Sequence, residues 1–210
     1  MQSGNDGIGL GGSTGSGGQG WRGSLRNPPF LMFLISMVIF HLGNSSNAFL
    51  ILKARETGLS VTLIPLIWMV YNGVCTGSSP LFGSLSDRVG RKPVIVVSFP
   101  YYAAVYSLFG LAGEVWMMWA LFAAYGVYYG LSEGIFRAYI ADLVGPEHRG
   151  SAYGIFNTGI GLALFPASLI MGALWDRYGS RTAFLAAAAL SLLGFLSFVA
   201  SLPLQRRWKP

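Results

Sequence analysis

Six long apolar stretches dominate this chain, and they constrain its fold more than any other feature of the sequence. Each is close to the length of about 20 residues that an α-helix needs to cross ~30 Å of hydrocarbon. They cover approximately residues 30–52, 61–85, 93–112, 115–140, 152–175 and 183–202. Because 53% of the residues are hydrophobic and only 10% are charged, a soluble domain would expose large apolar patches. The sequence therefore predicts an all-α integral membrane protein with six transmembrane helices.

The polar ends of the chain set the predicted domain limits. Residues 1–28 are rich in Gly, Ser, Asn and Gln and lack an apolar segment, so we expect a flexible cytoplasmic tail or linker there. Residues 29–204 form the predicted transmembrane domain, and residues 205–210 form a short basic cytoplasmic tail. The connections between the apolar stretches are short, which predicts antiparallel neighbouring helices.

The basic residues between the apolar stretches predict the orientation in the membrane. With the N-terminus in the cytoplasm, nine of them lie on the inner side and four on the outer side. The inner set is Arg22, Arg26, Arg88, Arg91, Lys92, Arg149, Arg206, Arg207 and Lys209, and the outer set is Lys53, Arg55, Arg177 and Arg181. Since cytoplasmic loops carry an excess of Lys and Arg, we expect both termini on the cytoplasmic side of a plasma or inner membrane. The basic residues form short clusters and no continuous face, which excludes a nucleic-acid-binding surface.

One signature, G-x-L-x-D-R-x-G, occurs twice in the chain, 89 positions apart. The first copy contains Gly83, Asp87, Arg88 and Gly90, followed by Arg91 and Lys92, and the second contains Gly172, Asp176, Arg177 and Gly179. In the predicted orientation the two copies lie on opposite faces of the membrane. The sequence therefore predicts two sets of three helices with reversed orientation, an arrangement that is common in secondary transporters.

The first copy, read as Gly83-Ser-Leu-Ser-Asp87-Arg88-Val-Gly90-Arg91-Lys92, resembles the loop motif of the major facilitator superfamily. The segment from Ala141 to Gly154 resembles a later loop of that family, and the likeness covers roughly residues 28–204. Family members contain two six-helix halves, each with a nested three-plus-three inverted repeat. The chain resembles one half, most like the C-terminal one, because of its Gly-rich lead-in and residues 43–49.

The resemblance implies transport of a small solute by alternating access, driven by a gradient as a symporter or antiporter. The partner would be a complementary six-helix half or a second copy of the chain. By the resemblance, the loop from Gly83 to Lys92 holds the two halves together in one state, with Asp87 near a helix N-terminus of the other half. The simpler interpretation of such a loop is a basic cytoplasmic turn. For the second copy, at residues 172–179, the corresponding interpretation is an inherited turn with no gating role.

Two charged residues, Glu133 and Arg137, lie inside the fourth apolar stretch. Their i, i+4 spacing with the acid first favours a helical ion pair. Charges within a membrane span normally face protein or water. The pair either braces the Asp87 loop near the inner interface or couples transport to protons or solute, and the sequence leaves both roles open.

Polar and aromatic residues on the first and fourth stretches form the candidate solute path. His41, Asn44 and Asn47 interrupt the first stretch, and Tyr125 and Tyr129 share one side of the fourth. The resemblance implies that helices one and four of each half line the path. Hydrogen bonding between helices and simple aromatic packing are the alternative roles for these side chains.

Enzyme chemistry finds no support in the sequence. The chain has one cysteine and two histidines, and it contains no zinc-protease, phosphate-loop or serine-nucleophile motif. We therefore expect no catalytic residue, metal site or cofactor. The competing function is a non-transporting six-helix scaffold that binds another membrane protein, and the identity of a transported solute is not encoded in any recognisable motif.

Overall fold

A computed structural model describes residues 23–207, and within that range every regular element is helical. The elements are α2 (Pro28–Leu42), α3 (Ala48–Glu56), η1 (Val61–Leu63), α4 (Ile64–Val89), α5 (Arg91–Leu111), α6 (Val115–Leu143), η2 (Pro146–His148) and α7 (Arg149–Arg206). The prediction of an all-α fold is therefore confirmed for this range. Most of the tail predicted for residues 1–28 lies outside the described residues, as do residues 208–210. Gln205, which was expected in a C-terminal tail, is instead buried within α7.

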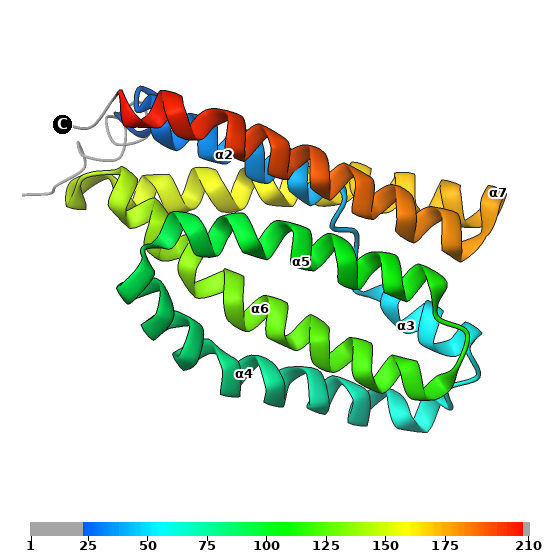
Figure 1. Ribbon diagram of the computed structural model, residues 1–210. Helices are drawn as coiled ribbons and strands as arrows, with labels where there is room; N and C mark the ends of the chain where they lie inside the picture. The colour runs from blue at the N-terminus through cyan, green and yellow to red at the C-terminus, as the bar shows by residue number, and fades with distance from the viewer. Residues whose placement is uncertain (1–22, 208–210) are drawn as a thin grey trace, which may run out of the picture.

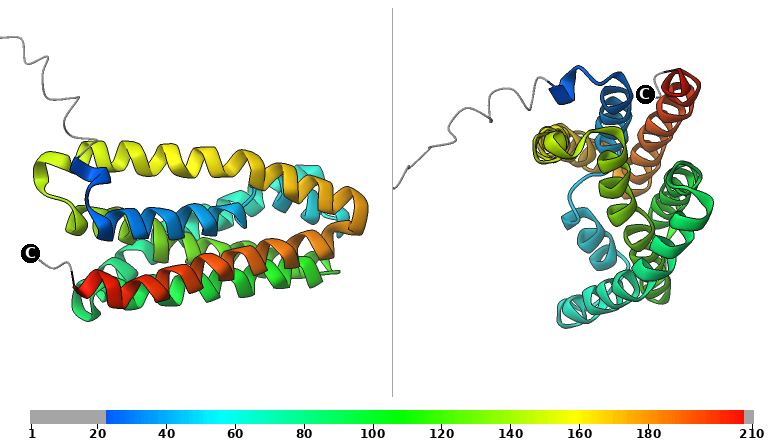
Figure 2. Two further views of the ribbon diagram at one scale, coloured as in Figure 1. Left: turned by 90° about the horizontal axis from the view of Figure 1, so that it is seen from above. Right: turned by 90° about the vertical axis from the view of Figure 1, so that its left-hand side faces the viewer.

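The helices run along one common axis and form an elongated bundle (Figure 1). Viewed from its end, the bundle has α6 near the middle of the section and α4 at its edge (Figure 2). Between residues 23 and 207, three helical segments are long and apolar enough to cross a membrane: Val61–Val89, Arg91–Leu111 and Pro146–Gln205. The apolar segment Pro28–Leu42 is shorter. Helix α6 has 29 residues and is not among these three segments.

The first predicted span, residues 30–52, is not one continuous helix. Helix α2 ends at Leu42 and α3 begins at Ala48. At the break, the Tyr102 hydroxyl donates a hydrogen bond to the carbonyl of Gly43 over 3.1 Å. Gly43 itself packs against the backbone of Ala187 and against Ser191 so closely that a Cβ atom would collide with both. The prediction of an uninterrupted helix here is wrong because tertiary contacts hold an open backbone at residues 43–47.

Two glycines reverse the chain at opposite ends of the bundle (Figure 1). Gly90, between α4 and α5, has φ 89° and ψ 156°. Gly179 has φ 82° and ψ 167°, and there α7 folds back into two arms, residues 149–178 and 180–206. These angles lie where only glycine is unstrained. The last glycine of both signature copies thus has the same backbone conformation.

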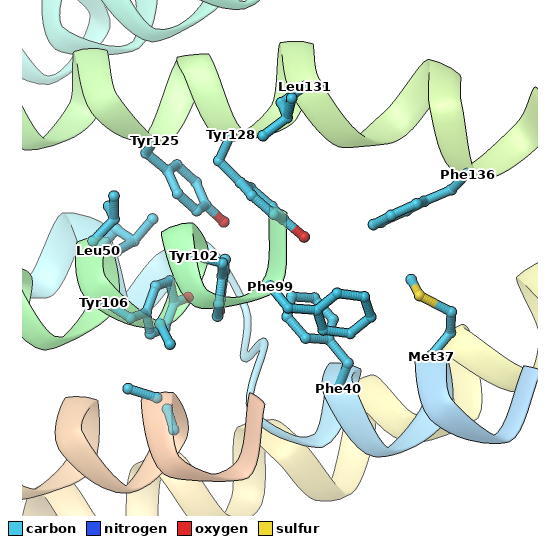
Figure 3. Packing of buried hydrophobic residues seen from close by; sticks show 14 of the residues in the cluster. Met37, Phe40, Leu50, Phe99, Tyr102, Tyr106, Tyr125, Tyr128, Leu131 and Phe136 are labelled. Carbon is cyan, nitrogen blue, oxygen red and sulfur yellow. The ribbon is translucent and has the colours of Figure 1, made fainter. Parts of the chain in front are cut away.

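Aromatic side chains fill the space between α2, α5 and α6 (Figure 3). Phe40 lies 4.7 Å from Phe99, and Tyr102 lies 4.9 Å from Tyr128, measured between ring centroids. Edge-to-face and offset contacts of this kind each stabilise the fold by about 0.5–1.5 kcal/mol beyond the burial of area. The aromatic core fixes α6 against α2, and so positions the polar residues that both helices carry.

Helix α4 packs on α6 through glycine contacts. A Cβ atom on Gly126 would meet the carbonyl of Tyr71, and one on Gly130 would meet Ser78 and the carbonyl of Cys75. The lack of a side chain at these two glycines therefore lets α4 and α6 approach closely. Gly134, the third glycine of the same spacing, has open space beside it.

Candidate functional site

A cavity of about 170 Å³ lies between α2, α6 and the first arm of α7, and we call it the central cavity. Phe136, Phe156 and Ile160 supply apolar wall. The polar and charged lining consists of His41, Asn44, Tyr128, Tyr129, Ser132, Glu133, Arg137 and Asn157. Apolar walls with a few converging polar groups are typical of sites that bind small molecules.

The Glu133–Arg137 pair lies in the wall of the central cavity. Arg137 Nη2 donates to Glu133 Oε1 over 2.9 Å. Within the isolated chain the Arg137 side chain is 65% exposed and the Glu133 side chain is 56% exposed. Because exposed ion pairs are worth only about 0.2–1 kcal/mol, a charged group of a solute can compete for either partner. Within residues 23–207 neither side chain forms an ion pair with the loop from Gly83 to Lys92.

The open backbone between α2 and α3 contributes a hydrogen-bonded chain beside the cavity. The Tyr125 hydroxyl donates to Asn47 Oδ1 over 3.0 Å and lies 3.3 Å from the Tyr129 hydroxyl, which can donate to it in turn. His41 Nδ1 is 2.7 Å from the carbonyl of Met37. When Nδ1 carries the proton and donates there, Nε2 of a neutral ring is left as an acceptor.

The residues expected on the solute path therefore fall into two groups. His41, Asn44 and Tyr129 line the central cavity. Asn47 and Tyr125 do not line it, and they connect to it only through the Tyr129 hydroxyl. Tyr125 is fully buried among other aromatic rings, which is the environment of a packing residue.

The first copy of the signature lies on the last turns of α4 and ends in the chain reversal at Gly90, which is tied to the end of α6. Arg91 forms an ion pair with Asp142 and donates to the carbonyl of Ala138. Asp87 and Arg88 are exposed, and neither forms an ion pair with any residue between 23 and 207. Lys92 Nζ lies 6.0 Å from the centre of the Tyr139 ring.

The second copy lies on the first arm of α7 and ends in the chain reversal at Gly179, which is tied to α3. Lys53 Nζ donates to Ser180 Oγ over 3.0 Å and forms an ion pair with Glu56 Oε2 at 3.4 Å. The Lys53 side chain is only 7% exposed. Asp176 and Arg177 are exposed, as Asp87 and Arg88 are in the first turn.

Several lining and bracing residues were not among the sequence predictions. The missed lining residues are Tyr128, Ser132, Phe136, Phe156, Asn157 and Ile160, and the missed bracing residues are Lys53, Asp142 and Ser180. Ser132 and Phe136 follow Tyr128 at i+4 and i+8, so the stripe could have been extended along α6. Asn157 is a polar residue inside an apolar stretch, the same signal that pointed to Asn44.

No group of three or more His, Cys, Asp or Glu side chains suited to a metal ion occurs in the described part of the chain. The arrangement is that of a binding site in which a carboxylate, a guanidinium, amides and aromatic rings surround a small cavity. It offers recognition of a solute and no covalent chemistry.

Comparison with protein families gives a match to the Major Facilitator Superfamily over residues 30–210. The chain belongs to the major facilitator superfamily. It is 34% identical over 184 residues to an uncharacterised transporter of this type from Methanocaldococcus jannaschii, a match that covers 84% of the chain and 46% of the relative. This family member is therefore an integral membrane protein related to transporters, and not an enzyme.

Two relatives that are named for drug resistance match shorter parts of this family member. The multidrug resistance protein MdtG of Enterobacter lignolyticus is 36% identical over 120 residues, which cover 57% of the chain and 28% of that protein. The class C tetracycline resistance protein of Escherichia coli is 30% identical over 118 residues, which cover 56% of the chain and 29% of that protein. The chain thus spans less than half the length of each of these relatives.

Proposed function

We propose that this chain forms one half of a secondary transporter and that its central cavity is this half's share of the solute path. The observation that carries the proposal is the Glu133–Arg137 pair at 2.9 Å in the wall of a cavity, within a chain that is otherwise apolar. Charges within a membrane protein are retained where they face water, solute or each other. A cavity at a discontinuous first helix also matches the general design of transporter sites.

The proposed membrane arrangement has six spans in two sets of three, with both termini in the cytoplasm. Helices α2 and α3 together form the first span, and the arms of α7 form the fifth and sixth. Asn44 and Glu133, which are separated by the same 89 positions as the signature copies, both line the central cavity. An inverted repeat brings such equivalent residues to a site at the interface of its two parts, so the position of this pair supports the arrangement.

A second six-helix body is part of the proposal. Large apolar side chains are exposed on α4 and on the first arm of α7, among them Leu81 at 69%, Leu162 at 72% and Phe165 at 71%. Lipid covers part of such a surface, but the Glu133 and Arg137 side chains in the wall of the central cavity are more than half exposed, so a facing wall is needed to enclose a solute. A complementary half or a second copy of the chain would supply that wall.

The first solutes to test are aromatic, amphipathic drugs. The central cavity combines aromatic walls with a carboxylate, a guanidinium and amides, which suits a solute with both ring surface and polar groups. The names of the tetracycline and multidrug resistance relatives indicate the same solute class for those proteins. Export coupled to proton entry would then make Glu133 the candidate proton-carrying group.

Drug accumulation in a bacterium without its own pumps tests the proposal. The chain is expressed alone and together with the part of the Methanocaldococcus jannaschii relative that it does not match. We expect reduced accumulation of tetracycline or a lipophilic dye with an assembled pair, and its loss in Glu133→Gln. The matched control is Glu114→Gln, an exposed carboxylate at the start of α6, which should leave export unchanged.

The same experiment separates transport from the scaffold alternative. Loss of proton-dependent export in Glu133→Gln, with the folded chain still present in the membrane, supports a coupling role for Glu133. Proton dependence that is unchanged in Glu133→Gln leaves only a structural role for the pair. If folded chain is present in the membrane but no solute moves with either partner, the transport proposal is wrong and partner binding remains.

A further inference from the structure

The His41 ring in the wall of the central cavity is held in one orientation by a backbone hydrogen bond. His41 lies on the last turn of α2, and its Nδ1 atom is 2.7 Å from the carbonyl oxygen of Met37. A carbonyl oxygen can only accept, so Nδ1 must carry the proton and donate to it. The contact therefore holds a neutral ring in the tautomer that has a lone pair on Nε2.

The second ring nitrogen, Nε2, is free to meet a ligand. No group between residues 23 and 207 forms a hydrogen bond with it. It is not enclosed by protein either, in contrast to Nδ1 of His148 and Oγ of Ser45, which are buried without a partner. Because His41 lines the central cavity, a solute there can reach Nε2 without any movement of the ring.

His41 Nε2 differs in chemistry from the other polar groups of the same wall. The hydroxyl and amide side chains of the lining can donate as well as accept. Glu133 only accepts, and Arg137 already donates to one of its oxygens over 2.9 Å. The neutral His41 ring thus supplies a fixed acceptor. A solute that brings an O–H or N–H group to Nε2 gains a hydrogen bond, whereas an ether oxygen at the same place leaves both atoms unpaired.

The size and walls of the central cavity suit one aromatic ring of a solute. The cavity has a volume of about 170 Å³, and an apolar cavity of about 150 Å³ is large enough to hold benzene. Phe136 and Phe156 line the same cavity as His41, and aromatic side chains favour stacked or edge-to-face contact with another ring. A phenol can therefore pack against these rings while its hydroxyl donates to Nε2.

We propose that His41 Nε2 selects solutes that carry a hydroxyl or N–H donor on an aromatic ring. This role rests on the proposed function, because it takes the central cavity as the site of the solute. It adds the group that distinguishes one aromatic solute from another. A phenol should bind about tenfold more tightly than its methyl ether, which has the same ring and oxygen but no donor.

The tautomer of His41 can be measured without any solute or transport. The chain contains two histidines, so labelling with nitrogen-15 histidine gives two rings, and the variant His148→Phe assigns them. For the full chain in detergent at neutral pH, we expect His41 to show a protonated Nδ1 and an unprotonated Nε2. A proton on Nε2, either in the other tautomer or in a charged ring, would overturn the proposal.

Binding of para-fluorophenol and para-fluoroanisole, followed by fluorine NMR, tests the selection itself. Protein-free micelles give the partition of each probe into detergent. We expect the parent chain to bind the phenol about tenfold more tightly than the ether, and His41→Phe to abolish this preference. The matched control is His148→Phe, which should keep the preference because His148 lies in η2, outside the lining of the central cavity.

The same probes give a second measurement on the parent chain, in case His41→Phe does not fold. The phenol should shift the nitrogen-15 signal of His41 Nε2, and the ether should leave it in place. Thermal unfolding of each variant without probe shows whether it is folded.

The outcomes separate this role of His41 from the transport proposal. Equal affinity for the two probes, binding of neither, or an unchanged preference in folded His41→Phe would overturn the role of Nε2. None of these results would alter the export experiment, which is judged by drug accumulation. Preference for the phenol in a chain that exports no drug would support the role of Nε2 and contradict the transport proposal alone.

Discussion

The two turns that end the signature copies share a backbone conformation but differ in the contact that holds each of them to a neighbouring helix. In the first the cation lies in the turn, and in the second it lies on the neighbouring helix. Gly90 and Gly179 differ by only a few degrees in φ and by 11° in ψ, and they reverse the chain at opposite ends of the bundle. After Gly90 the turn supplies a cation, Arg91, to an acid on α6. After Gly179 the turn supplies a hydroxyl acceptor, Ser180, to a cation on α3.

The residues of the two contacts are related by the same separation in the sequence. Ser180 lies 89 positions after Arg91, and Asp142 lies 89 positions after Lys53, the separation of the two signature copies. In both signature copies the turn is thus held to a neighbouring helix at corresponding positions, by an ion pair after Gly90 and by a lysine–hydroxyl hydrogen bond after Gly179. The comparison teaches that the two turns are braced at the same places with different chemistry.

Substitution of the two glycines should have the largest effect and the same effect at both turns. A β-branched residue at such a φ is strained by about 1–3 kcal/mol. We expect Gly90→Val and Gly179→Val each to lower the free energy of unfolding by that amount, measured by denaturant unfolding in mild detergent. Gly134→Val is the control, because Gly134 has ordinary helical geometry and open space beside it. An effect at only one turn would contradict their equivalence.

The first turn should be more sensitive than the second to loss of the contact that holds it to its neighbouring helix. Arg91→Gln removes both the ion pair with Asp142 and the bond to the carbonyl of Ala138. We expect a loss of about 1–2 kcal/mol, because Asp142 is half exposed and water partly replaces the arginine. In Asp142→Asn the Arg91→Gln change should cost less, and the difference between the two measures the pair. A full loss in both backgrounds would assign the effect to Ala138 alone.

The sequence predicts the helices and chain reversals of this protein better than it predicts the contacts between its helices. Apolar stretches and the repeated glycines predict helices and reversals, because hydrophobic length and positive φ are local properties of the chain. The break between α2 and α3 could not be predicted, since it depends on Tyr102 and Ala187 meeting Gly43 from distant segments.

The bracing contacts show the same limit for the candidate site. The i, i+4 spacing of Glu133 and Arg137 predicted an ion pair, which the structure contains. Asp142 lay within a segment that resembled the family, but no spacing rule connects it to Arg91. The two residues meet only because α5 and α6 pack side by side. The residue pattern of one helix does not predict which residues of another helix it will contact.

Converting the Lys53–Ser180 contact of the second turn into an ion pair should stabilise the chain. In Ser180→Asp a carboxylate replaces the hydroxyl that Lys53 contacts at 3.0 Å, and it also lies at the start of the second arm of α7, where a negative charge is favourable. We expect a gain of about 1 kcal/mol in the free energy of unfolding. Ser180→Asn, which is similar in size but neutral, should give no gain. Equal stability of the two variants would show that Lys53 does not respond to the charge.

Replacement of Lys53 by an apolar residue of similar length should have the smallest effect. The side chain is 7% exposed and its partner Glu56 is half exposed, so Lys53→Met removes a costly buried charge while Glu56 remains in contact with water. Replacing a buried ionic group by a well-packed apolar one is often neutral, and we expect a change within about 0.5 kcal/mol. Lys53→Ala should be worse, because it also leaves a gap beside Ser180. A large loss of unfolding free energy in Lys53→Met would mean that the second turn depends on the Lys53 charge as strongly as the first turn depends on Arg91. The two contacts would then be equivalent in strength as well as in position.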